Sequence, residues 1–286
     1  MQIMSVTGSQ KFAVLLCKFR DTKDTELHPV CFYADLFATN GSGGLNDYWR
    51  SASLGAINLD GTDVFGWQTI DDTLANYIAT HPDCTDKLQG AIDAFKEVDA
   101  SKYTAVIPLF NASLGDGGET TGGIVGNPAD VNVTWLAHET GHIFGLEHSF
   151  DMSDRKAISW SAPGEYYDSY DIMSAMNVDG DSGHQFSPRG PLLNAANLIR
   201  MDWIEPDRIW TPRKTNSSAT YDVDIVALEQ PEINGFLAAK VGGVIIEFRI
   251  NTGFDAGLAR PAVLIHQPAE PNSVIVASDL VHFVNE

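Results

Sequence analysis

Three histidines and a glutamate in one short stretch have the types and spacing of a zinc site that performs hydrolysis. His138 and His142 are four residues apart, so on an α-helix both side chains project from one face and can bind one metal ion. Glu139 follows the first histidine, where a carboxylate can reach a water on the metal. His148 comes six residues after His142, so the chain must turn back. Gly145 permits that turn because glycine adopts the left-handed backbone conformation at little cost.

Three neutral imidazoles and one open position form the ligand set of a catalytic zinc, whereas a structural zinc is usually closed by four protein ligands. The short form H-E-x-x-H alone also occurs in helices whose histidines are solvated or packed in a core. The glycine and the third histidine at their set offsets argue against coincidence. We therefore expect Zn²⁺ at His138, His142 and His148, with Glu139 as the general base that takes a proton from water and passes it to the leaving amine.

The full motif H-E-x-x-H-x-x-G-x-x-H is similar to that of the metzincin metallopeptidases. That family also has a methionine-containing turn beneath the metal, and the matching stretch here is Tyr170-Asp171-Ile172-Met173-Ser174. The resemblance implies that Met173 packs below the site and that the chain is a zinc-dependent endopeptidase acting on protein or peptide substrates. The stretch Asp47-Tyr48-Trp49, followed by Ser53-Leu54-Gly55, resembles the gametolysin-like and immune-inhibitor-like bacterial peptidases.

One position departs from part of that family. Astacins and serralysins place a tyrosine two residues after the methionine of the turn, and this chain has Ala175. A tyrosine that serves as a switch-off ligand or assists the oxyanion is therefore absent here or supplied from nearby. The candidates are Tyr166, Tyr167, Tyr170 and His184.

The glycine-rich segment 111–130 is long for a connection, and long loops are usually functional or mobile. In metzincins the comparable region holds the edge strand that pairs with an extended substrate. The resemblance therefore implies that Gly122, Gly123 and Ile124 bind the substrate by strand addition. A surface loop is the alternative interpretation.

The chain has 286 residues, of which 44% are hydrophobic and 20% are charged, and its net charge is −20. This acidity argues against nucleic acid and anionic membrane surfaces as partners. We interpret the acid excess chiefly as a means of keeping a secreted protein soluble. Ca²⁺ is a second candidate cofactor, with the Asp179-Gly180-Asp181 loop and the 111–130 segment as weak candidate sites.

The sequence has few features that indicate a membrane span, a signal peptide or a disulfide framework. No stretch approaches the roughly 18 apolar residues needed to cross a bilayer, so we expect no membrane insertion. No signal peptide is visible, although secretion is the expected localisation. Three cysteines are too few for a disulfide scaffold, and none lies near the histidine motif; they are Cys17, Cys31 and Cys84.

Periodicity predicts an α+β fold with a catalytic domain over 1–205, built from a twisted mixed sheet, an active-site helix and a methionine-turn subdomain. The expected elements are a central strand at 12–19, helices at 28–37, 71–98 (broken at 81–83), 132–144 and 190–203, a strand at 103–110 and a hairpin at 56–67.

In residues 206–286, β-type runs alternate with turn residues, and this pattern predicts a small antiparallel β-sandwich. In the run 242–251 we expect Glu247 and Arg249 to share a solvated face. No catalytic feature is found in this region. The alternative to an endopeptidase is a non-catalytic zinc-binding module or an adhesion module. In that case the β-rich C-terminal domain binds a protein or a glycan.

Overall fold

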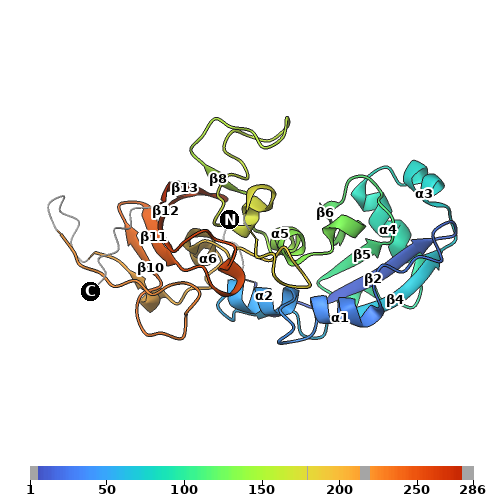
Figure 1. Ribbon diagram of the computed structural model, residues 1–286, viewed down its shortest axis with the longest axis horizontal. Helices are drawn as coiled ribbons and strands as arrows, with labels where there is room; N and C mark the ends of the chain where they lie inside the picture. The colour runs from blue at the N-terminus through green and yellow to red at the C-terminus, as the bar shows by residue number, and fades with distance from the viewer. Residues whose placement is uncertain (1–5, 179, 213–219, 279–286) are drawn as a thin grey trace.

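The computed structural model describes residues 6–178, 180–212 and 220–278, and it confirms the α+β class (Figure 1). A five-stranded sheet lies at one end of the elongated molecule and a six-stranded sheet lies at the other. Helix α5 (Val133–Ile143) lies between the two sheets. Within the described ranges, no helix is long and apolar enough to cross a membrane.

The five-stranded sheet has the strand order β4-β2-β5-β7-β6. Its strands are β2 (Phe12–Phe19), β4 (Asp63–Ile70), β5 (Ala105–Phe110), β6 (Gly118–Thr120) and β7 (Gly123–Val125). The first four in this order run parallel, while β6 forms an antiparallel hairpin with β7 and lies at the edge. The sheet is thus mixed, and its antiparallel edge strand lies on the same side as α5, with which it makes contact.

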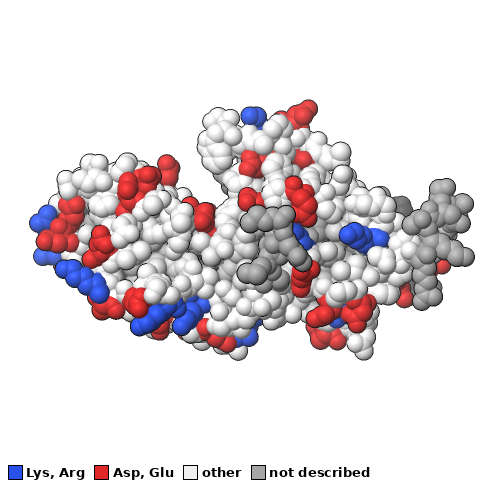
Figure 2. Space-filling model, turned by 180° about the vertical axis from the view of Figure 1, so that it is seen from behind, with Lys and Arg blue, Asp and Glu red and all other residues white. Residues whose placement is uncertain are grey.

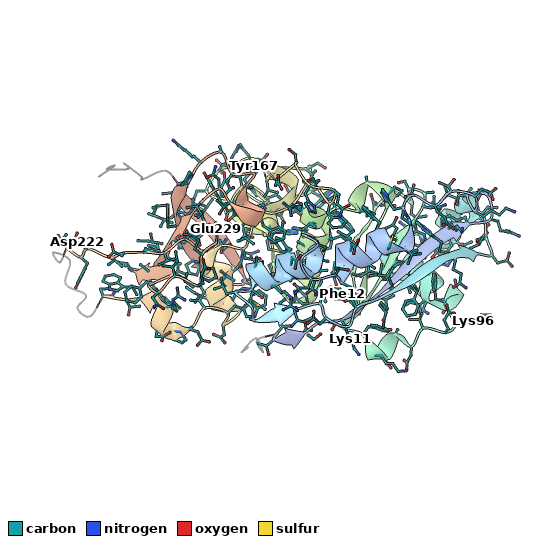
Figure 3. The ribbon with its side chains drawn as sticks, turned by 60° about the horizontal axis from the view of Figure 1, so that its bottom comes forward. Lys11, Phe12, Lys96, Tyr167, Asp222 and Glu229 are labelled. Carbon is teal, nitrogen blue, oxygen red and sulfur yellow. The ribbon has the colours of Figure 1, made fainter. Side chains whose placement is uncertain are left out.

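Strand β2 is the central strand that the sequence predicts, and its apolar residues are buried on both faces. Phe12, Val14 and Leu16 pack against one helical layer, and the alternate residues pack against the other. The first layer contains α1 (Val30–Phe37), α2 (Leu45–Ala52) and α5, and the second contains α3 (Leu74–Thr80) and α4 (Cys84–Ala94). Side chains fill the space between the layers, and Phe12 is labelled among them in Figure 3. A continuous apolar strand is typical of such a sandwiched position.

The predicted hairpin at 56–67 is wrong. Strand β3 (Ile57–Asn58) pairs in parallel with β1 (Gly8–Ser9), while β4 pairs in parallel with β2. The turn at Asp60-Gly61 therefore separates strands of two different sheets. The two-part helical segment at 71–98 is confirmed as α3 and α4, with the break at the expected position.

The six-stranded sheet has the order β8-β13-β12-β11-β10-β9. Its strands are β8 (Ser149–Asp151), β9 (Ile209–Trp210), β10 (Ala238–Val241), β11 (Val244–Arg249), β12 (Ala262–Ala269) and β13 (Asn272–Ser278). All the strands described after residue 206 belong to this one sheet, so the two facing sheets of the predicted sandwich are not seen among them. The sheet also includes β8, which comes from before residue 205, so strands from both sides of the predicted boundary are hydrogen bonded.

The predicted solvated face of β11 is wrong. Glu247 and Arg249 do share a face, but both are fully buried, while Val244, Ile246 and Phe248 on the opposite face are partly exposed. Helix α6 (Ala195–Arg200) packs on this sheet and covers the buried face.

Arg249 has three carboxylate partners in this buried layer. Its guanidinium lies 2.8 Å from Glu229, 3.3 Å from Glu247 and 2.5 Å from Asp255. Glu229 is labelled in Figure 3. The guanidinium thus faces three acidic side chains where water is excluded, and burial raises the pKa of one of them, Glu229, to about 8.

Five short 3₁₀ helices connect these elements in the described ranges: η1 (Ala100–Lys102), η2 (Pro128–Asp130), η3 (Ile172–Asn177), η4 (Pro206–Arg208) and η5 (Gly253–Asp255). Helix η3 contacts α5, and it contains Met173.

Candidate metal centre

Helix α5 begins and ends as the sequence predicts. The side chain of Asn132 caps it by accepting a hydrogen bond of 2.9 Å from the backbone N–H of Trp135. Trp49 of α2 donates its indole N–H to the hydroxyl oxygen of Thr140 at 2.7 Å, which fixes the helix against the core. Gly145 then has a φ of 86°, the left-handed conformation that turns the chain back toward the helix.

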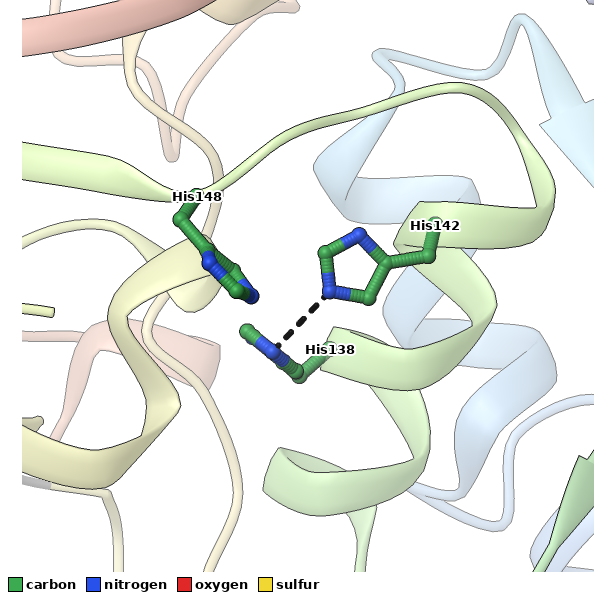
Figure 4. Close-up of side chains that lie close together, drawn as sticks. All are labelled: His138, His142 and His148. Atoms are coloured by element: carbon green, nitrogen blue, oxygen red, sulfur yellow. Dashed lines mark hydrogen bonds between the residues drawn. The ribbon is translucent and has the colours of Figure 1, made fainter. Parts of the chain in front are cut away.

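The three motif histidines meet at one point (Figure 4). Nε2 of His138 lies 3.2 Å from Nε2 of His142, and one ligand atom from each of the three rings lies within 4.8 Å of the others. Two nitrogens on one tetrahedral zinc, each about 2.0–2.1 Å from the metal, are about 3.3 Å apart. The separation between His138 and His142 therefore fits a shared metal ion.

The other nitrogen of each ring faces an oxygen acceptor. Nδ1 of His138 lies 3.0 Å from the carbonyl oxygen of Ile172, and Nδ1 of His142 lies 2.9 Å from that of Leu146. Nδ1 of His148 lies 2.6 Å from Oε1 of Glu165. These acceptors assign the proton to Nδ1 in each ring, so the lone pairs reside on Nε2. Two facing lone pairs repel each other unless a cation lies between them.

Burial keeps the helix histidines neutral. It lowers the pKa of His138 to about 3, with the neighbouring His142 contributing to the same shift. Burial also lowers the pKa of His142. Neutral imidazoles are the form that binds metal, so both residues are ready to bind an ion at neutral pH.

Glu139 lies beside the trio and contacts the edge strand. Its Oε2 accepts a hydrogen bond of 2.8 Å from the backbone N–H of Glu119 in β6. Burial raises the pKa of Glu139 to about 7, although this hydrogen bond acts in the opposite direction. A carboxyl group with a pKa near neutrality can both accept and return a proton.

The predicted substrate residues do not lie at the sheet edge. Gly123 and Ile124 are buried in β7, which is hydrogen bonded to β5 on one side and to β6 on the other. Gly122 is in the exposed turn of the hairpin, with a φ of 86°. Strand β6 (Gly118–Thr120), which precedes these residues, is the edge strand and the one that reaches Glu139. A sequence pattern of Gly and Thr on both sides of the turn could not distinguish the two strands.

Met173 lies beneath α5 and is fully buried. A Cβ atom placed on Gly141 would be 2.6 Å from the Met173 sulfur. The Met173 side chain therefore packs directly against the backbone of α5 at Gly141. Asp171 holds this turn, because its Oδ1 accepts the backbone N–H of Met173 at 2.7 Å and its Oδ2 accepts that of Asn194 at 2.9 Å. The methionine thus packs against the helix between the first two histidines.

Among the four alternative side chains, Tyr166 contacts a motif histidine, with its hydroxyl 3.0 Å from Nε2 of His148. Burial raises the pKa of Tyr166. The hydroxyl of Tyr167 instead donates to a backbone carbonyl at 3.3 Å, and His184 packs beside Phe186. The sequence analysis missed Glu165, because this residue lies at no fixed spacing from the histidine motif.

A pocket of about 440 Å³ opens next to His138 and Glu139. Apolar side chains line much of it, including Trp135, Ile158 and Trp160. Trp160 is 72% exposed, which places it at the rim. Seen from behind, the outline of the molecule is indented between the lobe of the five-stranded sheet and the segment after β8, and acidic side chains are spread over this face (Figure 2).

A larger groove of about 800 Å³ lies away from the histidines, between α2 and C-terminal segments. Its arginines are already paired, Arg50 with Asp60 and Arg189 with Asp181, each at 2.6 Å. The smaller pocket is therefore the better candidate for a reactive site, because His138 of the histidine trio and the carboxyl group of Glu139 line it.

The histidine trio is the only group of three or more potential ligands found in the described ranges. Of the predicted calcium loop, Asp179 lies outside the described residues, and Asp181 is paired with Arg189. The three cysteines are free thiols. Of these candidate groups, the three histidines are therefore the one whose arrangement supports metal binding.

Comparison of the chain with protein-family models, with curated proteins and with solved structures gave no match. The interpretation of the site therefore depends on its own geometry.

Proposed function

We propose that this chain is a zinc-dependent endopeptidase of the metzincin type. The main support is the convergence of three Nε2 lone pairs beside the buried carboxylate of Glu139. A zinc ion bound there would supply Lewis-acid chemistry, polarising the carbonyl group of a peptide and acidifying water. The mixed sheet with its antiparallel edge, the turn at Gly145 and Met173 under the helix are further features in favour of this family.

Glu139 is the residue that moves protons in this proposal. Its Oε2 accepts the Glu119 N–H, so we assign proton transfer to Oε1. Oε1 takes a proton from the attacking water and delivers it to the nitrogen of the leaving amine. The substrate main chain lies along β6, and one of its side chains enters the 440 Å³ pocket.

The C-terminal sheet supports the site in this proposal. Strand β13 pairs in parallel with β8, whose first residue directly follows His148. Asn272 donates a hydrogen bond of 2.9 Å to the backbone carbonyl of His148. These contacts favour a sheet that is part of the catalytic unit over a separate partner-binding module.

The test is digestion of denatured casein by the purified full chain, with metal analysis and with or without a zinc chelator. We expect about one zinc per chain and internal cleavage that the chelator abolishes. Glu139→Gln should lower kcat by at least about 10² while zinc remains bound. The exposed Glu147, mutated to Gln, is the matched control and should retain activity. Zinc binding without cleavage by the unmutated chain would favour the non-catalytic module instead.

A further inference from the structure

The ring of His148 has a hydrogen-bond acceptor of a different kind from those of the other two histidines. Oε1 of Glu165 lies 2.6 Å from Nδ1 of His148, whereas the acceptors of the other two rings are neutral backbone carbonyls. A hydrogen bond to an ionised acceptor is shorter and about twice as strong as one between neutral groups. Of the three rings, that of His148 is therefore held by the strongest hydrogen bond.

Both oxygens of the Glu165 carboxylate are used. Oε2 accepts a hydrogen bond of 2.6 Å from the backbone N–H of Ala162, while Oε1 accepts from His148. The Glu165 side chain is only 14% exposed, so little water competes for these oxygens. A glutamine at this position has one acceptor oxygen and one NH₂ donor, so it can satisfy only one of the two N–H groups. The two contacts together therefore require a carboxylate.

The backbone places Glu165 beside the third histidine. The chain leaves His148 through β8 and returns alongside it, where Glu165 forms a β-bridge with Phe150. Next to this bridge, the N–H of Asp151 donates to the carbonyl of Gly164 at 2.9 Å. On its other side β8 pairs with β13. Strand β8 is thus held between two neighbours, and one of them carries the carboxylate that contacts the ring.

We propose that Glu165 is a positioning residue that acts through His148. By accepting the Nδ1 proton it keeps that proton off the metal-binding nitrogen, fixes the orientation of the ring and makes His148 the strongest electron donor of the three ligands. A carboxylate in this relation to a metal-binding histidine typically contributes about 10- to 100-fold to metal affinity. The inference rests on metal binding at the three histidines, which is part of the proposed function, but it does not require peptide cleavage.

The experiment compares Glu165→Gln with Glu147→Gln in the full chain. Glu147 is exposed and directly precedes His148, so this control removes the same charge from a position next to the ligand. The first readout is the zinc affinity of the metal-stripped chain, measured by chelator competition. Glu165→Gln should bind zinc about 10- to 100-fold more weakly. Glu147→Gln should bind zinc as the unmutated chain does.

The second readout is the ¹⁵N NMR spectrum of the histidine rings in the metal-stripped chain, at about pH 8, where imidazole is ordinarily neutral. The signals of His148 are those lost in His148→Gln. We expect the proton on Nδ1 alone in the unmutated chain and in Glu147→Gln. In Glu165→Gln one amide oxygen is shared between two N–H groups, so a mixture of Nδ1- and Nε2-protonated rings is expected. A role limited to stability would leave this proton distribution unchanged.

Three outcomes overturn the inference. The first is equal zinc affinity of Glu165→Gln and Glu147→Gln. The second is weaker zinc binding by Glu165→Gln with an unchanged proton distribution, because the carboxylate would then act by its charge alone. The third is a proton on Nε2 of His148 in the unmutated chain, which decides the matter whether or not the variants fold.

The endopeptidase is tested separately. If Glu165→Gln shows both effects and the unmutated chain binds zinc but cleaves no peptide, the proposed function is refuted and the role of Glu165 is supported. If Glu165→Gln shows neither effect and the unmutated chain cleaves casein, the endopeptidase stands and the role of Glu165 is refuted. An unmutated chain that binds no zinc would refute both.

Discussion

Asn272 of the last described strand donates a hydrogen bond of 2.9 Å to the backbone carbonyl of His148, 124 residues earlier. Strand β13 begins at Asn272 and pairs in parallel with β8, which begins directly after His148, so that Ser273 lies opposite Ser149. The position of the third histidine is thus set by the C-terminal sheet, whereas the first two are set by α5.

Replacing Asn272 with Ala should therefore weaken metal binding more than its modest cost in stability suggests. We expect a loss of about 0.5–1.5 kcal/mol in unfolding free energy, the usual worth of one hydrogen bond. Chelator competition should show zinc affinity lowered several-fold, because His148 is less well held. Asn251→Ala, at an exposed turn position, is the control. Equal zinc affinities for the two variants would contradict this account.

The contact between Gly141 and Met173 leaves no room for a methyl group. Gly141→Ala should lower the unfolding free energy by about 1–3 kcal/mol through overpacking, and Met173→Ala should lower it by about 2–5 kcal/mol through a cavity. Because the added methyl would partly fill the space left by Met173, the double variant should be more stable than the sum of the two losses predicts. Urea denaturation of the four proteins forms the double-mutant cycle. Strict additivity would show that the two residues are not in contact.

Asp171 should make stability depend on pH. Burial raises the pKa of Asp171 from 3.8 to about 6 in the folded chain, chiefly by desolvation. Between these values the folded protein binds more protons than the unfolded chain, so the unfolding free energy falls as pH rises. The fall from this group is on the order of 3 kcal/mol and is complete above about pH 6. Asp171→Asn should remove it.

The measurement is urea denaturation at several pH values between 4 and 7. The unmutated chain should lose stability relative to Asp171→Asn as pH rises through this window. The highly exposed Asp71, mutated to Asn, should keep the unmutated pH slope. A difference between the unmutated chain and Asp171→Asn that does not vary with pH would be inconsistent with the raised pKa.

Replacing the buried Arg249 with Met should destabilise the fold severely. Its removal leaves three carboxylates close together and out of water, and breaking buried ion pairs in this way costs about 3–5 kcal/mol. Arg20→Met breaks an exposed pair with Asp71 and should change stability by about 0–1 kcal/mol. Thermal unfolding separates the two cases. Similar midpoints for both variants would argue that the buried cluster adds nothing to stability.

The sequence predicts the features of this fold that depend on short-range spacing. The i, i+4 histidines and the left-handed Gly145 are local, so they follow from residue types alone. The apolar run of β2 likewise indicates a strand buried on both faces.

Long-range pairing could not be predicted in the same way. Nothing in the pattern around Asp60 distinguishes a hairpin from two parallel strands of different sheets. Alternation placed Glu247 and Arg249 on one face correctly, but it gave no sign that α6 covers that face. The contacts of Glu165 and Tyr166 with His148 depend on how an irregular segment returns to the helix. Such positions follow from tertiary packing rather than from periodicity.

The parallel pairing of β8 with β13 has a consequence for the order of events during synthesis. A ribosome releases the helix that bears the first two imidazoles long before the strand that steadies the third. A nascent chain is therefore expected to acquire its full ligand set only after β13 has been synthesised, and fragments that stop short of Asn272 should be poor metal binders. Under the proposed function, late completion of the ligand set would keep the unfinished chain from cleaving other proteins.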